Sequence, residues 1–177
     1  IKILYLLKIF QEETDAEHGL TMSQILERLD EYGIHAERKS IYADIRALRE
    51  FDIDIKTYQR NPVEYAIEHR DFTLGELMLM VDAIQSCRAI TDKQANMLIT
   101  NIKTLANNYG QQMLNRRIHV VGRVKTKNES VFGTVDTIHD AMRLRCKLGF
   151  FYKKAGTEGK SHLVTPVAIT YDDGFYY

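Results

Sequence analysis

The chain has 177 residues, of which 45% are hydrophobic and 27% charged, and its 24 basic and 24 acidic side chains give a formal net charge of zero. This composition is typical of an ordinary soluble globular protein. No apolar run approaches the roughly 20 residues that a membrane span requires, so we expect no membrane partner. The only two cysteines, Cys87 and Cys146, lie too far apart for a metal or disulfide framework, which favours a cytoplasmic location.

The first predicted element is an amphipathic helix over residues 1–13. We expect its buried side to consist of Ile3, Leu4, Leu7 and Phe10. A secretion signal is the alternative interpretation, but Lys8 interrupts the apolar run and no small-residue cleavage site follows.

A second helix is predicted from Thr21 to about Tyr32. Thr21 and Gln24 have the spacing of a capping box, and Gly33 suits the position just after a helix ends. The expected core residues of this helix are Ile25, Leu26 and Leu29.

The third predicted helix begins near Glu37 and is apolar on one side and basic on the other. Ile41, Ile45 and Leu48 recur at the i, i+4, i+7 spacing of a buried face. Two helices joined by a short glycine turn, the second one basic, are typical of a helix-turn-helix, whose second helix enters the major groove of DNA. The expected DNA-binding residues of this helix are Arg38, Lys39, Ser40, Tyr42, Arg46 and Arg49.

A β-hairpin is predicted from the alternating segments 53–58 and 64–68, which flank Asn61-Pro62. A hairpin directly after a recognition helix is the wing of a winged helix, and Lys56 and Arg60 would then contact phosphate. The alternative is a hairpin that only packs against the helices, with solvated charges at its tip.

Residues 71–115 are predicted to form a helical region. Thr73 with Glu76 and Thr91 with Gln94 match two capping boxes, each followed by apolar residues at helical spacing, which indicates a helical hairpin. The Met and Leu stripe of this region favours core packing and a homodimer contact over a ligand pocket.

Beyond this region we expect an extended linker over residues 116–135 and a β domain over 136–177. Thr137 is predicted to cap a short helix, and strands are predicted over residues 148–152, over 162–171 and from 175 onward. The Asp173-Gly174 pair indicates a tight hairpin turn before the last strand. Because the chain ends within an apolar pattern, we expect this β domain to be truncated.

Charge is unevenly distributed. Residues 1–70 carry ten basic and fourteen acidic side chains, a net −4, whereas residues 115–163 carry eleven and four, a net +7. Cations mixed with aromatic residues in the second half are typical of a surface that binds single-stranded nucleic acid or a nucleotide. They fit equally a small β domain with an aromatic core and solvated cations. We find no catalytic, metal-binding or cofactor-binding constellation, so we expect neither an enzyme nor a cofactor.

These motifs together resemble the WYL-domain transcriptional regulators of bacteria. The segment Arg38-Lys39-Ser40-Ile41-Tyr42-Ala43-Asp44-Ile45-Arg46-Ala47-Leu48 is similar to the family's recognition helix, with Ser40 and Ala43 in place of the usual Thr and Arg. The family's Trp-Tyr-Leu signature would fall at Phe175-Tyr176-Tyr177 or one residue later, and its tryptophan is absent. Phe150 and Tyr152 match the family's aromatic strand, and His162-Leu163-Val164-Thr165-Pro166 resembles its R-x-V-x-P stretch, with His162 in place of Arg.

The resemblance implies an α+β fold. Its parts would be a DeoR-like winged helix-turn-helix over residues 1–70, the helical dimerisation region, and an incomplete Sm-like β-barrel. It further implies a regulator that binds double-stranded DNA as a homodimer and senses a nucleotide or single-stranded nucleic acid. The residues expected to bind that ligand are Tyr152, Lys153, His162 and Tyr176. The alternative function is a winged-helix module that binds another protein and selects no DNA sequence.

Overall fold

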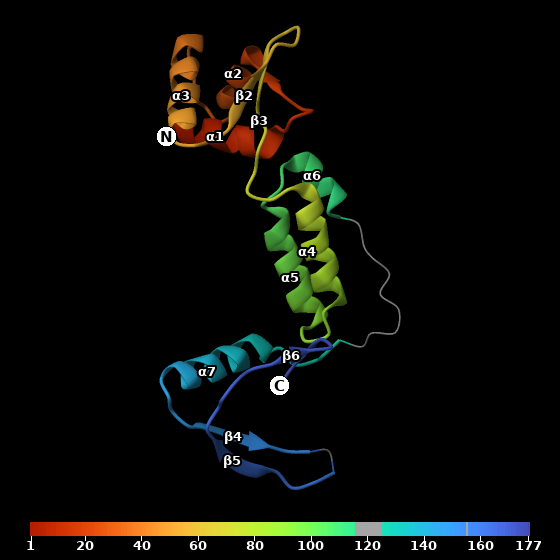
Figure 1. Cartoon of the computed structure of the whole chain (residues 1–177). Coiled ribbons are helices and arrows are strands. Elements are labelled where there is room, and N and C mark those ends of the chain that lie inside the picture. The colour runs from red at the N-terminus through yellow and green to blue at the C-terminus, as the bar shows by residue number, and fades with distance from the viewer. Residues whose placement is uncertain (116–124, 155) are drawn as a thin grey trace. The chain divides into compact units, whose positions relative to one another are not determined.

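The structure, a computed structural model, describes residues 1–115, 125–154 and 156–177. In these ranges the fold is mixed α and β, with seven helices and three small antiparallel sheets (Figure 1). The described chain divides into two compact units: residues 1–82 with 99–115, and residues 83–98 with 125–177. Within the described residues, none of the helices combines the length and apolar character needed to cross a membrane.

The first unit begins with three helices and a three-stranded sheet. In chain order these elements are α1 (Lys2–Glu13), β1 (Leu20–Thr21), α2 (Met22–Glu31), α3 (Arg38–Glu50), β2 (Ile55–Tyr58) and β3 (Glu64–Ile67). The strands are antiparallel in the order β1-β3-β2, so β3 is central, with Leu20 opposite Tyr65 and Lys56 opposite Ala66. The predicted hairpin is therefore confirmed, and β1 extends it into a sheet.

Helix α1 packs against α2 and α3, and of its predicted core residues Phe10 is buried and Ile3 and Leu7 pack partly buried against the core, but Leu4 does not. Leu6, Ile9 and Phe10 are buried, whereas Leu4 is 66% exposed. Almost every residue from Ile3 to Phe10 is apolar, so the sequence period alone did not identify the buried side.

The ends of α2 form as the sequence predicts. Gln24 N–H donates to Thr21 Oγ1 over 3.3 Å, and Thr21 N–H donates to Gln24 Oε1 over 2.8 Å, which completes the capping box. At the other end Gly33 has a φ of +72°, where a residue without Cβ is favoured. The N–H of Ile34 then donates to Leu29 O over 2.9 Å and closes the last turn.

Thr14 joins segments of the first unit that are far apart in the sequence. Its buried hydroxyl donates to Phe10 O over 2.6 Å and accepts the N–H of Ile67 over 3.0 Å. Its carbonyl accepts from Arg70 over 2.7 Å and from Asn107 Nδ2 over 2.9 Å. The turn after α1 therefore holds both the end of the hairpin and the chain before α6 (Asn108–Met113).

The two predicted helices after the hairpin are confirmed as α4 (Leu74–Ser86) and α5 (Asp92–Lys103), and α6 was not predicted. Both capping boxes form, since Thr73 N–H donates to Glu76 Oε2 over 2.7 Å and Thr91 N–H to Gln94 Oε1 over 3.0 Å. The division between the units falls within α4, after Asp82, and within α5, before Ile99.

The second unit contains α7 (Val131–Arg143) and two separate strand pairs. The strands are β4 (Leu148–Tyr152) with β5 (Lys160–Val164), and β6 (Tyr171–Asp172) with β7 (Phe175–Tyr176). Asp173 and Gly174 have φ values of 43° and 86°, which makes the predicted tight turn between β6 and β7. Among the described residues, no sheet closes into a barrel.

The predictions for the start of this region need correction. Helix α7 begins at Val131, so residues 131–135 are helical rather than extended, and Thr137 does not cap a helix. The Thr137 hydroxyl instead donates to Gly133 O over 2.7 Å, one turn back within α7. The strand predicted over residues 162–171 is also wrong in its second half, because β5 ends at Val164. Residues 116–124 of the predicted linker lie outside the described residues.

Thr14→Val should destabilise the first unit. The valine keeps the shape of the side chain but leaves the buried N–H of Ile67 without its acceptor, which costs about 1–3 kcal/mol of unfolding free energy. Urea unfolding followed by circular dichroism measures the difference. Thr104→Val is the control, because the exposed Thr104 hydroxyl, just after the end of α5, also donates to a carbonyl of the preceding helix, Asn101 O. Equal stability of the two variants would contradict the role of Thr14.

Candidate nucleic-acid interface

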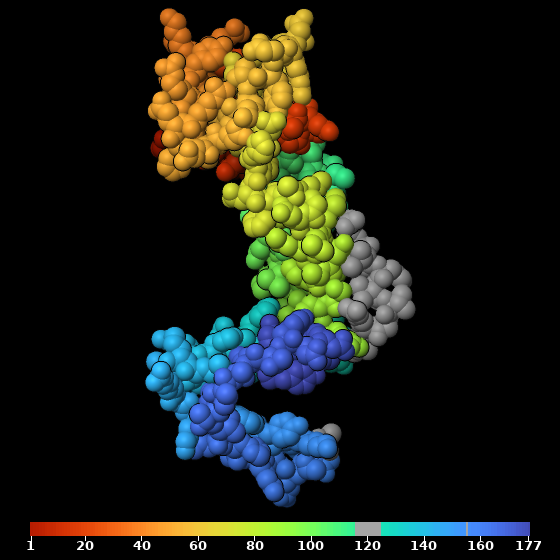
Figure 2. All heavy atoms as spheres, viewed as in Figure 1, coloured from red at the N-terminus to blue at the C-terminus, as the bar shows by residue number. Residues whose placement is uncertain are grey.

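The orientation of α3 follows from its apolar residues. Ile41, Ile45 and Leu48 are buried in the core of the first unit, at relative exposures of 0 to 5%. Because a helix advances by about 100° per residue, this stripe leaves the opposite side of α3 to solvent. Figure 2 shows the atoms of α3, in orange, at the surface of the first unit.

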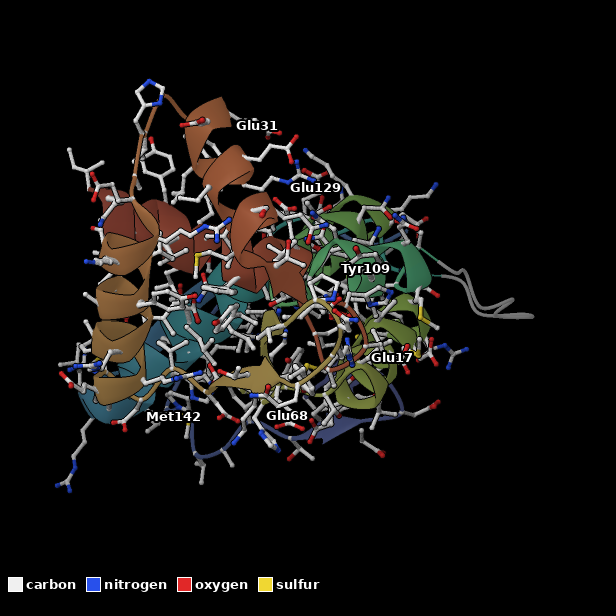
Figure 3. All side chains as sticks on the ribbon, turned by 90° about the horizontal axis from the view of Figure 1, so that it is seen from above. Glu17, Glu31, Glu68, Tyr109, Glu129 and Met142 are labelled. Carbon is white, nitrogen blue, oxygen red and sulfur yellow. The ribbon has the colours of Figure 1, made fainter. Side chains whose placement is uncertain are left out.

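The exposed side of α3 collects most of the residues predicted to bind DNA. At that advance per residue, five of them fall within an arc of about 100° around the helix. These residues, which we call the α3 arc, are Arg38, Lys39, Tyr42, Arg46 and Arg49, and all are exposed. Figure 3 shows side chains extending outward from the α3 ribbon.

Most cations of the α3 arc have no acidic partner among the residues that the structure describes. Within the described part of the chain, neither Arg38, Lys39 nor Arg46 forms an ion pair or a side-chain hydrogen bond. Arg49 differs, because its Nε donates to Ile55 O over 2.7 Å and its Nη2 to Thr57 Oγ1 over 2.8 Å. Arg49 thus fixes the end of α3 to strand β2 and keeps its charge.

Tyr42 contacts the sheet beneath the α3 arc. Its ring meets that of Tyr65 edge-on, with the centroids 6.4 Å apart, and 47% of its surface stays exposed. Burial raises the pKa of Tyr65, and a hydrogen bond with Tyr42 raises it further. Tyr42 is therefore positioned by β3 and can still contact a partner.

Ser40, the sixth residue predicted on α3, lies outside this arc. It is half-buried, and its hydroxyl oxygen accepts a hydrogen bond from Lys2 Nζ of α1. The structure therefore places Ser40 on the side of α3 that meets α1.

The hairpin cation Lys56 lies among acidic groups. Its Nζ is 3.0 Å from Asp54 Oδ1 and 3.9 Å from Glu68 Oε2, and Glu68 is labelled in Figure 3. A hydrogen bond with Asp54 raises the pKa of Lys56. The pKa of Asp54 is lowered, mainly by a hydrogen bond from His69 and next by the one from Lys56.

In the described residues, Asp54, Glu68 and His69 are the one group with metal-ligand atoms within 4.8 Å of one another. The Lys56 ammonium group already supplies a positive charge beside the two carboxylates of this group, Asp54 and Glu68.

The second hairpin cation, Arg60, is held to the body of the first unit. Its guanidinium donates to Glu64 Oε2 over 2.7 Å, to Ala16 O over 2.9 Å and to Glu17 O over 3.2 Å. It also lies 4.6 Å from the centroid of the Tyr58 ring. For Lys56 and Arg60 to contact phosphate, both would have to leave these partners. From the sequence we identified Lys56 and Arg60 as cations of the hairpin, but not the acidic side chains that lie beside them.

The four residues predicted to bind an effector lie in the second unit. His162 on β5 lies opposite Phe150 on β4 and stacks on its ring at 5.5 Å, and the Tyr152 ring meets the same histidine edge-on, with centroids 6.4 Å apart. Lys153 follows β4 and is exposed. Tyr176 belongs to the separate β6–β7 pair, where its ring lies 5.0 Å from that of Tyr171. The structure thus brings Tyr152 and His162 together on one exposed sheet.

Tyr176 borders a mainly apolar hollow of about 290 Å³ in the second unit. Helix α7 supplies Val131, Val135 and Ile138 to it, and β7 supplies Phe175. Sequence reasoning missed this hollow, although the i, i+4, i+7 spacing of the three α7 residues was visible. None of Tyr152, Lys153 and His162 lines it.

Comparison with models of known protein families gives no match, and no curated protein matches the sequence.

Arg60→Ala should affect stability rather than nucleic-acid binding. Loss of its bonds to Glu64 and the loop before β1 should lower the unfolding free energy by about 1 kcal/mol. The salt dependence of DNA binding should stay unchanged. The control is Gln59→Ala, which alters the neighbouring exposed residue and should change neither quantity. A DNA-binding salt slope that falls by about one, with stability unchanged, would instead place Arg60 on a phosphate.

Proposed function

We propose that this protein is a bacterial transcriptional regulator of the WYL class that binds double-stranded DNA through α3. In this proposal α2 and α3 form the helix-turn-helix, and β2 and β3 form its wing. The three helices, the glycine turn at Gly33 and the hairpin directly after α3 support this interpretation.

The observation that carries the proposal is the α3 arc. A helix fits the major groove of B-form DNA, and arginine and lysine on its exposed side can reach base edges and phosphates. Arg38, Lys39 and Arg46 extend into solvent without a carboxylate partner among the described residues. Because these cations have no carboxylate partner, DNA binding need not break an ion pair within the protein. Each phosphate that they neutralise releases counterions from the DNA.

The net negative charge of residues 1–70 favours the α3 arc as the DNA-binding surface. Residues 1–70 carry a net charge of −4, so most of their surface repels DNA. We therefore assign the interface to α3, with Arg38, Lys39 and Tyr42 toward bases and the adjoining phosphates, and Arg46 and Arg49 toward the backbone further along. Lys56 and Arg60 take part only if DNA displaces their present partners.

We further propose that the second unit senses a nucleotide or single-stranded nucleic acid. The aromatic group of Phe150, Tyr152 and His162 offers rings for stacking, and Lys153 offers a phosphate partner. A homodimer would place two copies of α3 about 34–36 Å apart on a palindromic site. An effector would change DNA binding only by favouring one arrangement of the two copies over another.

The test uses a duplex selected by the full chain from a random pool. Arg38→Ala with Lys39→Ala should weaken binding by orders of magnitude and make the salt slope shallower by about two, one for each phosphate contact. Fluorescence anisotropy at several salt concentrations measures both.

The control removes the same formal charge elsewhere in the first unit, through Lys8→Ala with Lys103→Ala, and should leave the slope unchanged. If the wild-type chain selects no duplex, the alternative of a protein-binding module is favoured. If the two double variants behave alike, α3 is not the interface.

A further inference from the structure

Lys2 connects α1 to the recognition helix. Its Nζ lies 2.7 Å from Asp44 Oδ2 and also donates to Ser40 Oγ. The Lys2 and Asp44 side chains are only 27% and 18% exposed. Ser40 and Asp44 are one helical turn apart, so one ammonium group holds two consecutive turns of α3.

Asp44 is the one acidic residue between Arg38 and Arg49, so its charge state matters for the α3 arc. A helix is about 10–12 Å across, which is comparable to the screening length of about 10 Å at 0.1 M salt. An unpaired Asp44 carboxylate would therefore repel DNA phosphates and partly cancel the field of Arg46 and its neighbours. Among the described residues, Lys2 is the cation paired with it.

We propose that Lys2 is a positioning residue for DNA binding, which neutralises Asp44 and fixes α3 on α1. This inference rests on the proposed function. Lys2 itself lies on the side of α3 that meets α1 and contacts no DNA. The inference also gives Ser40 a role within the protein rather than at the base edges.

The experiment compares Lys2→Met, Asp44→Asn and the double variant in the full chain, on the duplex selected by the wild type. Lys2→Met leaves the carboxylate unpaired and should weaken binding roughly five- to tenfold at about 0.1 M salt. The deficit should shrink as salt rises, because it is electrostatic. The double variant should regain most of the lost affinity, because no unpaired charge remains.

Two further variants separate charge from structure. Lys8→Met removes another α1 lysine, which lies 4.0 Å from Glu12, and should bind DNA like the wild type. Asp44→Asn alone keeps the Lys2 charge and should bind at least as tightly as the wild type, so it tests the inference even if Lys2→Met folds poorly. Thermal unfolding by circular dichroism shows which variants are folded.

The outcomes distinguish the two proposals. If the wild type selects no duplex, the proposed function fails and this inference fails with it. If the wild type binds but a folded Lys2→Met variant binds equally well, only the role of Lys2 is overturned. The same holds if Asp44→Asn weakens binding, or if the double variant is as weak as Lys2→Met.

Discussion

The burial of Ile41, Ile45 and Leu48 is the constraint on which the other properties of the first unit depend. Removing these side chains from water fixes the rotation of α3 about its axis. That rotation decides which polar residues extend into solvent and which meet α1 or the sheet. The exposed cations are thus a consequence of core packing, and a change in the core would move them.

Ion pairing distinguishes the α3 arc from the other lysines and arginines of residues 1–60. Outside α3, several cations lie within 4.0 Å of a carboxylate, namely Lys2, Lys8, Arg28, Lys56 and Arg60. Within residues 1–60, all of which the structure describes, the lysines and arginines without a carboxylate partner all lie on this one helix. A molecule whose first seventy residues are acidic overall can therefore present a basic surface without a basic composition.

Local features of the fold were predictable from the sequence, and long-range pairs were not. The capping box of Thr21 and the glycine after α2 act within a few residues, so their residue types indicate them directly. The end of α3 has the same backbone geometry as that of α2 but uses Asp52, with a φ of 63°, and an aspartate gives a weaker signal than a glycine. The partners of Arg60 and Lys2 lie up to 44 residues away, and spacing carries no information about them.

The hydrogen bonds of Thr14 have a consequence for the order in which the protein is made. Because a ribosome releases the chain from its N-terminus, the bond from Asn107 to Thr14 forms only after residues 83–98, which belong to the second unit, have emerged. Translation thus supplies part of the second unit before the first is complete. A gene fragment cut after residue 70 would encode the three helices and the hairpin, yet it would lack the amide that closes the turn after α1.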